Sequence, residues 1–501
     1  MDKGGLVLPR KLPIFYSALL LTGVNLLLRF IGTSFQVHIS GRIGAAGVGL
    51  LQLVMSVGGL AMTAGMAGVR TATMYLTAEE LGRKRPQNVT WVLSGCVLYS
   101  ILCSGCIALA LQHFAPWIAG SWIGDVQTVG AIRLYGCFLP VSCLCGVMTG
   151  YFTAANRIGT LAAVEVAEQL CSMAMTMTLL NLWADHDPVK ACLAMILGSG
   201  ISCCLALGSL IILRVRESAG TGPRIPVRSR LLQTAVPLAL ADDLKTGIST
   251  TENLMVPKRL ALYSGVSDPL AAFGTVCGMV FPVLMFPAAI LYGLAELLIP
   301  ELARCAAAGS QQRIRYLTKR SLKVALLYGC VFCGLEYLLA KPLCQQLYGN
   351  QDAGRYLQLY ALLIPMLYCD AITDAMTKGL GQQKACVRYN IITSTMDVVL
   401  LFLLLPKYGM MGYFFSFFVT HLLNFFLSLR RLLMIAGNVI SVKAAVLTLG
   451  STLICIVIAS TLFSPFSQVV AFLAALISLL FLLRVLGTED ILWLKGLIVK
   501  K

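Results

Sequence analysis

The stretch WVLSGCVLYSILCSGCIALALQH, residues 91–113, contains no Asp, Glu, Lys or Arg. As a helix it would be about 34 Å long, which is enough to cross the ~30 Å hydrocarbon core of a bilayer. Runs of this kind recur along all 501 residues, and only 12% of the chain is charged, against about 25% in soluble domains. With a mean hydropathy of +0.82, the sequence predicts a polytopic membrane protein. It excludes an ordinary soluble enzyme, a disordered chain and a nucleic-acid-binding protein.

Fourteen apolar segments can be marked along the chain, and we expect each to be a transmembrane helix. They cover approximately residues 13–33, 48–76, 91–113, 129–153, 160–182, 190–213, 231–256, 270–300, 319–340, 355–378, 387–405, 410–430, 443–462 and 467–486. The expected fold class is therefore all-α, a polytopic membrane protein with about 14 transmembrane helices.

The cations predict how these segments are oriented. With the N-terminus inside, 28 of the 39 Lys and Arg residues fall on the cytoplasmic side, 8 on the opposite side and 3 within the spans. The bias alternates loop by loop, as the positive-inside rule requires, and it accounts for the net charge of +17 without nucleic acid. We therefore expect a multi-pass protein with both termini in the cytoplasm.

A weak internal repeat predicts the domain organisation. The motif Leu-Tyr-x4-Pro at 134–140 recurs at 359–365, and the polar stretch 214–230 separates the first six spans from the next six. Six spans per unit give both units the same orientation, as in transporters with parallel repeats. We expect an N-terminal six-helix lobe at 1–213, a cytoplasmic linker at 214–230, a C-terminal six-helix lobe at 231–431, and two additional transmembrane helices with a cytoplasmic tail at 432–501.

Motifs for catalysis and metal binding are absent from the sequence. The 18 cysteines lie mostly in apolar segments and are interpreted as small hydrophobic thiols, and neither CxxC pair has a His or a second Cys pair at ligand spacing. There is no P-loop, no H-E-x-x-H and no evident nucleophile–base constellation. We expect no metal, no cofactor and no enzyme activity. A membrane-embedded transferase is the alternative from another class, and the short loops disfavour it.

Several short motifs, taken in order, resemble one family. They are LRFIG at 28–32, RIGAAGVGLLQ at 42–52, TAG at 63–65 leading to AEE at 78–80, ENLMVPKRL at 252–260, IPEL at 299–302 and KGLGQ at 378–382. Over about 420 residues the chain resembles the stage V sporulation protein B group of polysaccharide flippases, in the superfamily of multidrug, oligosaccharidyl-lipid and polysaccharide exporters. The resemblance implies fourteen helices in two lobes around a central cavity.

The resemblance also implies a function. We expect a flippase, acting as a monomeric transport unit in the bacterial cytoplasmic membrane, that carries an undecaprenyl-pyrophosphate-linked oligosaccharide or peptidoglycan precursor outward by alternating access. Its partners would be the lipid-linked glycan and membrane lipid, and its setting spore cortex or cell-wall polysaccharide synthesis. The alternative is a Na⁺- or H⁺-coupled multidrug or metabolite antiporter of the same superfamily.

Thirteen ionisable residues fall inside the predicted spans, where each costs roughly 2.5–3.5 kcal/mol at the helix centre. Most should therefore face a wet cavity or one another. On the seventh span Asp242, Lys245 and Glu252 lie within an 80° stripe, while Asp243 points elsewhere. We predict that this stripe binds substrate. The alternative is a structural pair of Asp242 and Lys245.

Four cations are further substrate-binding candidates. Arg29 has the planar fork that matches a pyrophosphate or a sugar carboxylate, although an arginine here could instead extend to the interface. Arg70 has the same two interpretations, and its position near the cytoplasmic end favours the second. Lys258 and Arg259 follow the seventh span on the outer side, against the charge bias, and are candidate head-group contacts.

Four carboxylates are candidates for ion coupling, namely Glu165, Glu168, Asp370 and Asp374. The two glutamates share a face of the fifth span and could bind a cation or pair with Arg157. The two aspartates recur with Lys378 at i, i+4 and i+8, which is typical of a helix-end cluster and leaves a gating or ion-coupling role as the alternative.

Overall fold

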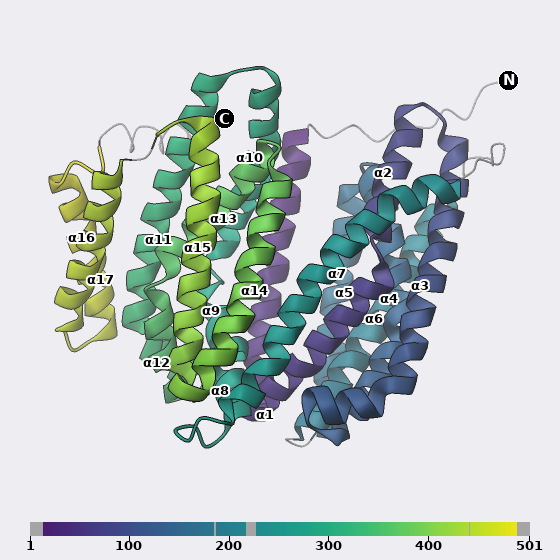
Figure 1. Cartoon of the computed structure of the whole chain (residues 1–501), viewed down its shortest axis with the longest axis horizontal. Coiled ribbons are helices and arrows are strands. Elements are labelled where there is room, and N and C mark those ends of the chain that lie inside the picture. Colours follow the sequence, from purple (N-terminus) through teal and green to yellow (C-terminus); the bar gives the residue numbers. More distant parts are fainter. Residues whose placement is uncertain (1–13, 185–186, 217–226, 440, 488–501) are drawn as a thin grey trace. The chain divides into compact units, whose positions relative to one another are not determined.

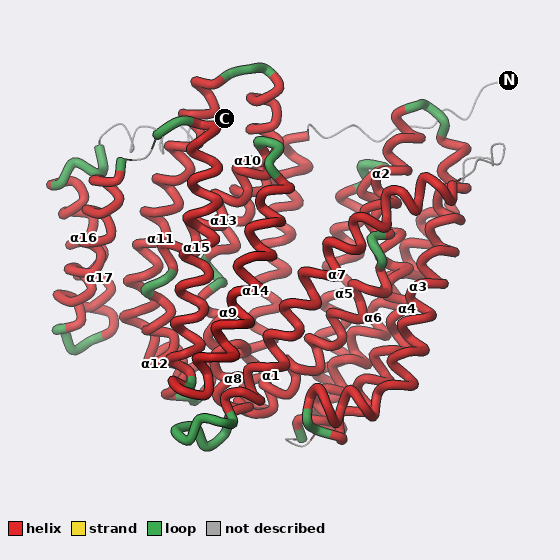
Figure 2. The backbone as a smooth tube through the Cα atoms, viewed as in Figure 1, coloured by secondary structure: helices red, strands yellow, loops and turns green. Residues whose placement is uncertain are grey.

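The computed structural model of the chain describes residues 14–184, 187–216, 227–439 and 441–487 (Figures 1 and 2). Within these ranges the regular structure is helical throughout, with no strand. The all-α class predicted from the sequence is confirmed. Residues 217–226 of the predicted linker and 488–501 of the predicted tail lie outside the described residues.

The chain divides into two compact units, Met1–Lys258 and Arg259–Lys501. The first contains α1 (Ile14–Met66), α2 (Val69–Gly82), α3 (Val89–Trp117), α4 (Val129–Ala154), α5 (Ile158–Leu179), α6 (Pro188–Arg216) and nearly all of α7 (Val227–Leu260). Helix α1 holds the first predicted span and most of the second. It kinks between them at Gly44, where φ is 68°. Glycine adopts this left-handed conformation without steric cost.

Helix α7 packs against α1 and α2. The Asn253 amide donates to the Ser56 hydroxyl at 3.0 Å, and the Thr63 hydroxyl donates to that of Thr246 at 3.3 Å. Ser56 precedes Thr63 on α1, whereas its partner Asn253 follows Thr246 on α7. The two helices are therefore antiparallel. The compact units therefore meet after Lys258 and not within 214–230. The four-part division drawn from the repeat stays a prediction.

The second unit contains two bent helix pairs. Its helices are α8 (Pro269–Gly274), α9 (Phe281–Leu284), α10 (Ala288–Ala307), α11 (Gln311–Tyr348), α12 (Gln351–Ala361), α13 (Ile364–Gly379), α14 (Gln383–Tyr408), α15 (Met410–Ala436), α16 (Val442–Ser460) and α17 (Pro465–Leu482). The pair Pro269–Leu284 and Ala288–Ala307 bends by 61°, and α12 with α13 bends by 58°. Helices α16 and α17 pack on α11.

The repeated motif takes two different backbone forms. Pro140 lies inside the unbroken helix α4, whereas Pro365 is the second residue of α13 and directly follows the 58° bend. Helix α11 passes close to this bend, because a Cβ atom on Gly329 would meet the Cα of Pro365 at 2.8 Å. Only glycine fits such an approach without displacing backbone. One copy of the motif is thus continuous and the other is broken.

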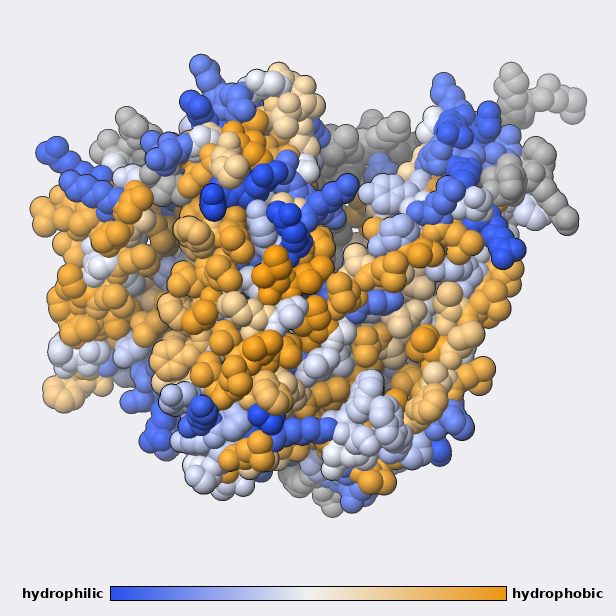
Figure 3. Space-filling view, in the orientation of Figure 1, coloured by the Kyte–Doolittle hydropathy of each residue, from blue (hydrophilic) through white to orange (hydrophobic). Residues whose placement is uncertain are grey.

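Ten of the described helices are long and apolar enough to cross a membrane, or twelve if each bent pair is one span. Every one of the fourteen predicted segments falls on a helix or a bent pair. The lower count arises because Leu26–Gly82 counts once although two predicted spans meet in it, and because the charged helix α7 does not qualify. In Figure 3 hydrophobic side chains cover the middle of the helices and hydrophilic ones gather at their ends. The polytopic class is confirmed, while the number fourteen stays a prediction.

Candidate functional site

The polar stripe of α7 is only partly buried. Asp242 and Lys245 are both exposed, Glu252 is half-buried, and no ion pair joins Asp242 to Lys245 in the described part of the chain. The geometry therefore does not show the structural pair that was the alternative. Asp243 departs from the stripe as predicted, since its Oδ1 atom is buried, with no hydrogen-bond partner among the described residues. Substrate binding by the stripe stays a prediction.

The structure brings Arg70 close to the carboxylates of the fifth span. Arg29 and Arg70 are exposed on α1 and α2, and the Arg70 charge acts on Glu165 of α5. Glu168 lies one turn further along α5. Both glutamates are half-buried. Ion coupling by these two glutamates stays a prediction.

The two cations after the seventh span bind backbone oxygens. Lys258 donates to the carbonyl of Ser121, within the first unit. Arg259 donates to the carbonyl of Phe402 through Nε at 3.2 Å and Nη2 at 2.9 Å, and its guanidinium lies 3.6 Å from the centre of the Phe402 ring. These contacts fix the end of α7 within each unit. A head-group role for either residue stays a prediction.

The predicted cluster on the tenth span forms. Lys378 and Asp374 make an ion pair at 2.6 Å in the last turns of α13. The Asn424 amide of α15 donates to both oxygens of Asp370, at 3.3 and 3.1 Å. The arrangement matches the helix-end cluster expected from the i, i+4 spacing. Ion coupling by Asp370 and Asp374 stays a prediction.

Asp397 of α14 is a buried carboxylate to which the sequence assigned no role. It accepts hydrogen bonds from Ser416 at 2.5 Å and from Thr420 at 3.3 Å, both on α15. The i, i+4 spacing of two hydroxyl residues was the available signal, but nothing in the sequence shows that α14 and α15 bring them to this aspartate.

An ion-pair network that we call the Arg230 clamp joins α2 to the start of α7. Arg230 contacts Glu79 at 2.5 Å and Glu80 at 2.8 Å, and Asn88 donates to Glu80 at 3.0 Å. Glu80 is only 2% exposed. Hydrogen bonds to Glu80 and Glu79 raise the pKa of Arg230, which precedes the predicted span at 231–256, so the guanidinium stays charged.

The second unit contains a groove of about 610 Å³ between α11, α13, α15 and α16. Its walls are mostly apolar, with Leu326, Leu363, Phe418, Leu422, Phe425 and Leu449 among the lining residues. Lys319 and Lys323, in the first turns of α11, and Arg484, just after α17, supply cations at one end. The charge bias assigns all three to the cytoplasmic side. Sequence reasoning missed this groove because its walls come from four separated helices.

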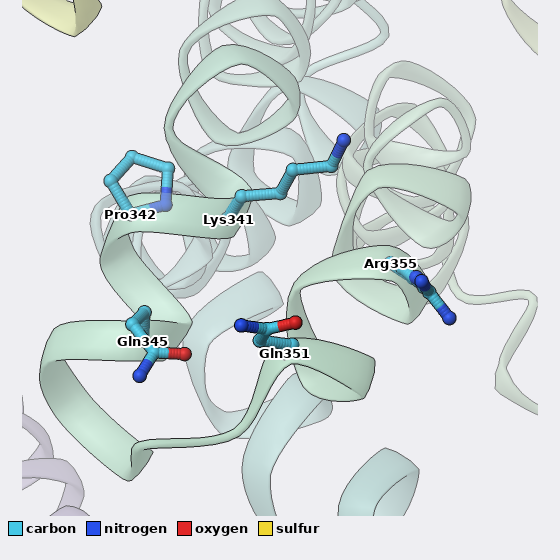
Figure 4. Close-up of a pocket in the computed structure, with 5 residues that line it drawn as sticks. All are labelled: Lys341, Pro342, Gln345, Gln351 and Arg355. Carbon is cyan, nitrogen blue, oxygen red and sulfur yellow. The ribbon is translucent and has the colours of Figure 1, made fainter.

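A second pocket, of about 440 Å³, lies at the other end of α11. Figure 4 shows its five side chains, Lys341, Pro342 and Gln345 from α11 and Gln351 and Arg355 from α12. Lys319 and Lys341 are 22 residues apart on one helix, or about 33 Å, which is close to the thickness of a bilayer core. The groove and the pocket thus lie at opposite ends of the span.

Solved structures share this fold. A lipid II flippase, MurJ in an inward closed conformation, matches with a TM-score of 0.69 at 12% identity, covering 93% of this chain and 99% of that one. A multidrug resistance MATE family transporter of the MOP superfamily, in an inward-facing conformation, matches with a TM-score of 0.63 at 13% identity, covering 84% and 99%. The chain therefore shares its fold with these two membrane proteins.

Sequence comparison adds a more particular resemblance. Residues 260–403 match the MatE family. Stage V sporulation protein B of Bacillus subtilis (strain 168) is 23% identical over 416 residues, which are 79% of this chain and 78% of that protein. The resemblance stated from the short motifs is confirmed. Together the comparisons relate this multi-pass chain to membrane flippases and transporters.

Proposed function

We propose that this protein is a flippase for a lipid with an anionic, glycan-bearing head group, such as an undecaprenyl-pyrophosphate-linked oligosaccharide or peptidoglycan precursor. The observation that carries the proposal is the groove of the second unit. Its apolar walls suit a long hydrocarbon tail, and Lys319, Lys323 and Arg484 suit phosphate oxygens at the membrane surface. The lipid enters from the cytoplasmic leaflet of a bacterial cytoplasmic membrane and leaves in the outer leaflet by alternating access.

The charges of the groove favour this substrate over a cationic drug. Three cations at one end of the groove repel a cationic compound and attract a phosphate. They therefore disfavour a cationic drug and favour a lipid phosphate. The groove also needs α16, which belongs to the two helices beyond the predicted six-helix repeats. The match to the lipid II flippase extends over more of the chain, 93%, than the match to the multidrug transporter, 84%.

We also propose that the polar residues of the first unit contact the head group. Arg29 and Arg70 present exposed guanidinium groups, and Lys245 lies with Asp242 and Glu252 on the stripe of α7. A guanidinium matches two phosphate oxygens at once, whereas an ammonium is a point charge. Arg29→Ala should therefore abolish translocation, and Arg29→Lys should still impair it. An arginine that only extends to the interface would tolerate lysine.

The groove is tested by binding of undecaprenyl pyrophosphate to the purified protein in nanodiscs. Each cation near a charged membrane surface contributes about 1 kcal/mol. The double variant Lys319→Gln/Lys323→Gln should therefore bind about 30-fold more weakly, from about 2 kcal/mol lost. Lys341→Gln/Arg355→Gln is the matched control, because it also removes two positive charges, from the pocket at the other end of α11.

Two results would contradict the proposal. One is equal binding by the double variant and the wild type. The other is efflux of a cationic dye by proteoliposomes that neither bind undecaprenyl pyrophosphate nor translocate a fluorescent lipid-linked sugar. The second outcome would instead support the antiporter, and its coupling ion would then be sought at Glu165, Glu168, Asp370 and Asp374.

A further inference from the structure

A buried carboxyl group lies in the middle of α11, away from the groove and from every candidate above. Glu336 is 6% exposed, and neither carboxylate oxygen has a hydrogen-bond partner in the described part of the chain. Moving an isolated carboxylate into an apolar medium costs far more than folding provides, so such a group stays neutral by holding a proton. Glu336 is therefore a carboxylic acid in the conformation described.

Glu336 faces the bend between α12 and α13. Gly329, Glu336 and Ala340 are spaced by seven and four residues, which places them within a 40° stripe of α11. On the N-terminal side of Glu336, Gly329 packs on Pro365 in the first turn of α13. On the C-terminal side, the carbonyl of Ala340 would lie 3.3 Å from a Cβ atom on Gly354 of α12. The acid thus lies between these two contacts, at the level where the helix is broken.

Two tyrosines connect the same region to the other bent pair. The Tyr328 hydroxyl donates to the carbonyl of Pro287 at 2.8 Å, and the Tyr368 hydroxyl donates to that of Leu284 at 3.1 Å. Tyr328 lies about two turns before Glu336 on α11, and its ring centre lies 5.9 Å from that of Tyr368. The Tyr368 hydroxyl thus bonds a carbonyl at the break between α9 and α10, and the Tyr328 hydroxyl bonds one that also accepts from the Ile290 N–H at 3.3 Å. Glu336 thus lies near both breaks.

The surroundings contain no counter-charge. The titratable groups that interact with Glu336 are Tyr328, Cys333 and Cys344 on α11 and Tyr368 on α13. From the helices that pack on α11, namely α10, α12, α13, α15, α16 and α17, no Asp, Glu, Lys, Arg or His among the described residues acts on it. Asp370 and Asp374 differ, because they have Asn424 and Lys378 as partners.

We propose that Glu336 is a proton-binding site of the transport cycle, loaded in the conformation described here and emptied when the α12–α13 bend changes. The step adds one proton from water to a carboxylate and later returns it to water, with no other reactant. The N-terminus of a helix carries a partial positive charge that favours a carboxylate, so a shift of the start of α13 toward Glu336 would promote release. This proposal rests on the proposed transport function, because a transport cycle exists only if the protein moves a substrate.

The first test requires no transported lipid. Dicyclohexylcarbodiimide forms an adduct with protonated carboxyl groups in apolar surroundings, and mass spectrometry of the digested protein locates it. We expect labelling of Glu336 at pH 6 that falls at least fivefold at pH 9. Glu301, which is ion-paired to Arg313 at 2.7 Å, is the control that should remain unlabelled. Absence of the adduct at both pH values, or equal labelling at both, overturns the proposal.

The second test uses Glu336→Gln, which keeps the shape of the neutral acid but cannot release a proton. We expect it to fold and to bind undecaprenyl pyrophosphate as the wild type does, while its translocation no longer responds to a pH gradient. An unchanged response overturns the proposal. If Glu336→Gln does not fold, the pH-dependent adduct on the wild type decides. If undecaprenyl pyrophosphate is not the substrate, the pH-dependent adduct on Glu336 is still expected. The two proposals can therefore be refuted independently.

Discussion

The Arg230 clamp allows a quantitative prediction that is independent of function. Glu79 is 40% exposed, and an exposed ion pair contributes about 0.2–1 kcal/mol. Glu80 is 2% exposed, and a hydrogen bond to a charged group contributes about 1.5–3 kcal/mol. We therefore expect Arg230→Gln to lower the free energy of unfolding by about 2–4 kcal/mol, and most of this loss to come from Glu80.

The partition is measured with two double-mutant cycles, Arg230→Gln combined with Glu79→Gln or with Glu80→Gln. Unfolding of the purified protein is followed by circular dichroism during titration with sodium dodecyl sulfate in mixed micelles. The coupling energy of Arg230 with Glu80 should be about 1.5–3 kcal/mol, and that with Glu79 below about 1 kcal/mol. Asn88 is unchanged in every variant, so any effect of Glu80→Gln on its bond appears in both the single and the double variant and cancels from the coupling energy.

Equal coupling energies for the two glutamates would refute this reasoning, because they would show that burial does not set the strength of the pair. A coupling energy for Glu80 below about 0.5 kcal/mol would do the same, since it falls in the range of exposed pairs.

Three further predictions follow from single contacts. Gly334→Ala should destabilise the protein by about 1–3 kcal/mol, because the new methyl group enters the space of the Phe472 ring, and the double variant with Phe472→Leu should recover part of this in the same unfolding assay. Arg259→Lys should cost about 1–2 kcal/mol, because lysine cannot make both bonds to the Phe402 carbonyl while stacking on its ring; a melting curve like that of the wild type would count against it. In a protein without its native cysteines, Asp268→Cys should react with an impermeant maleimide added outside intact cells, whereas protection at this position would reverse the predicted topology.

The existence of the helices could be predicted from the sequence, because a bilayer requires long apolar runs and these are visible without neighbours. The bends could not. The motif at 134–140 and its copy at 359–365 share the same proline spacing, yet only the second follows a break. What accompanies the break is the close contact of Gly329 with Pro365, and that depends on α11, which the motif does not contain.

The candidate site shows the same limit. The pair of Asp374 and Lys378 was predictable because both residues lie on one helix at i, i+4. The i, i+3 spacing of Asp242 and Lys245 suggested a pair as well, but both side chains are exposed and stay apart. The groove could not be foreseen, since its cations and its walls come from several helices spread over residues 319–485.

Because only one copy of the repeated motif is broken, the two units differ in how easily the helix bends at this motif. To bend at Pro140, α4 must give up backbone hydrogen bonds that a bilayer does not replace. At the break before Pro365 the helix is already interrupted, and the bond from the Leu363 N–H to the Tyr360 carbonyl at 2.9 Å crosses it, so a change of angle there puts fewer bonds at stake. The second unit can thus bend at the α12–α13 break, whereas the matching turn of α4 in the first unit resists bending. A substitution that stiffens residues 362–363 therefore acts on the rate of motion, whereas one in the matching turn of α4 acts on stability.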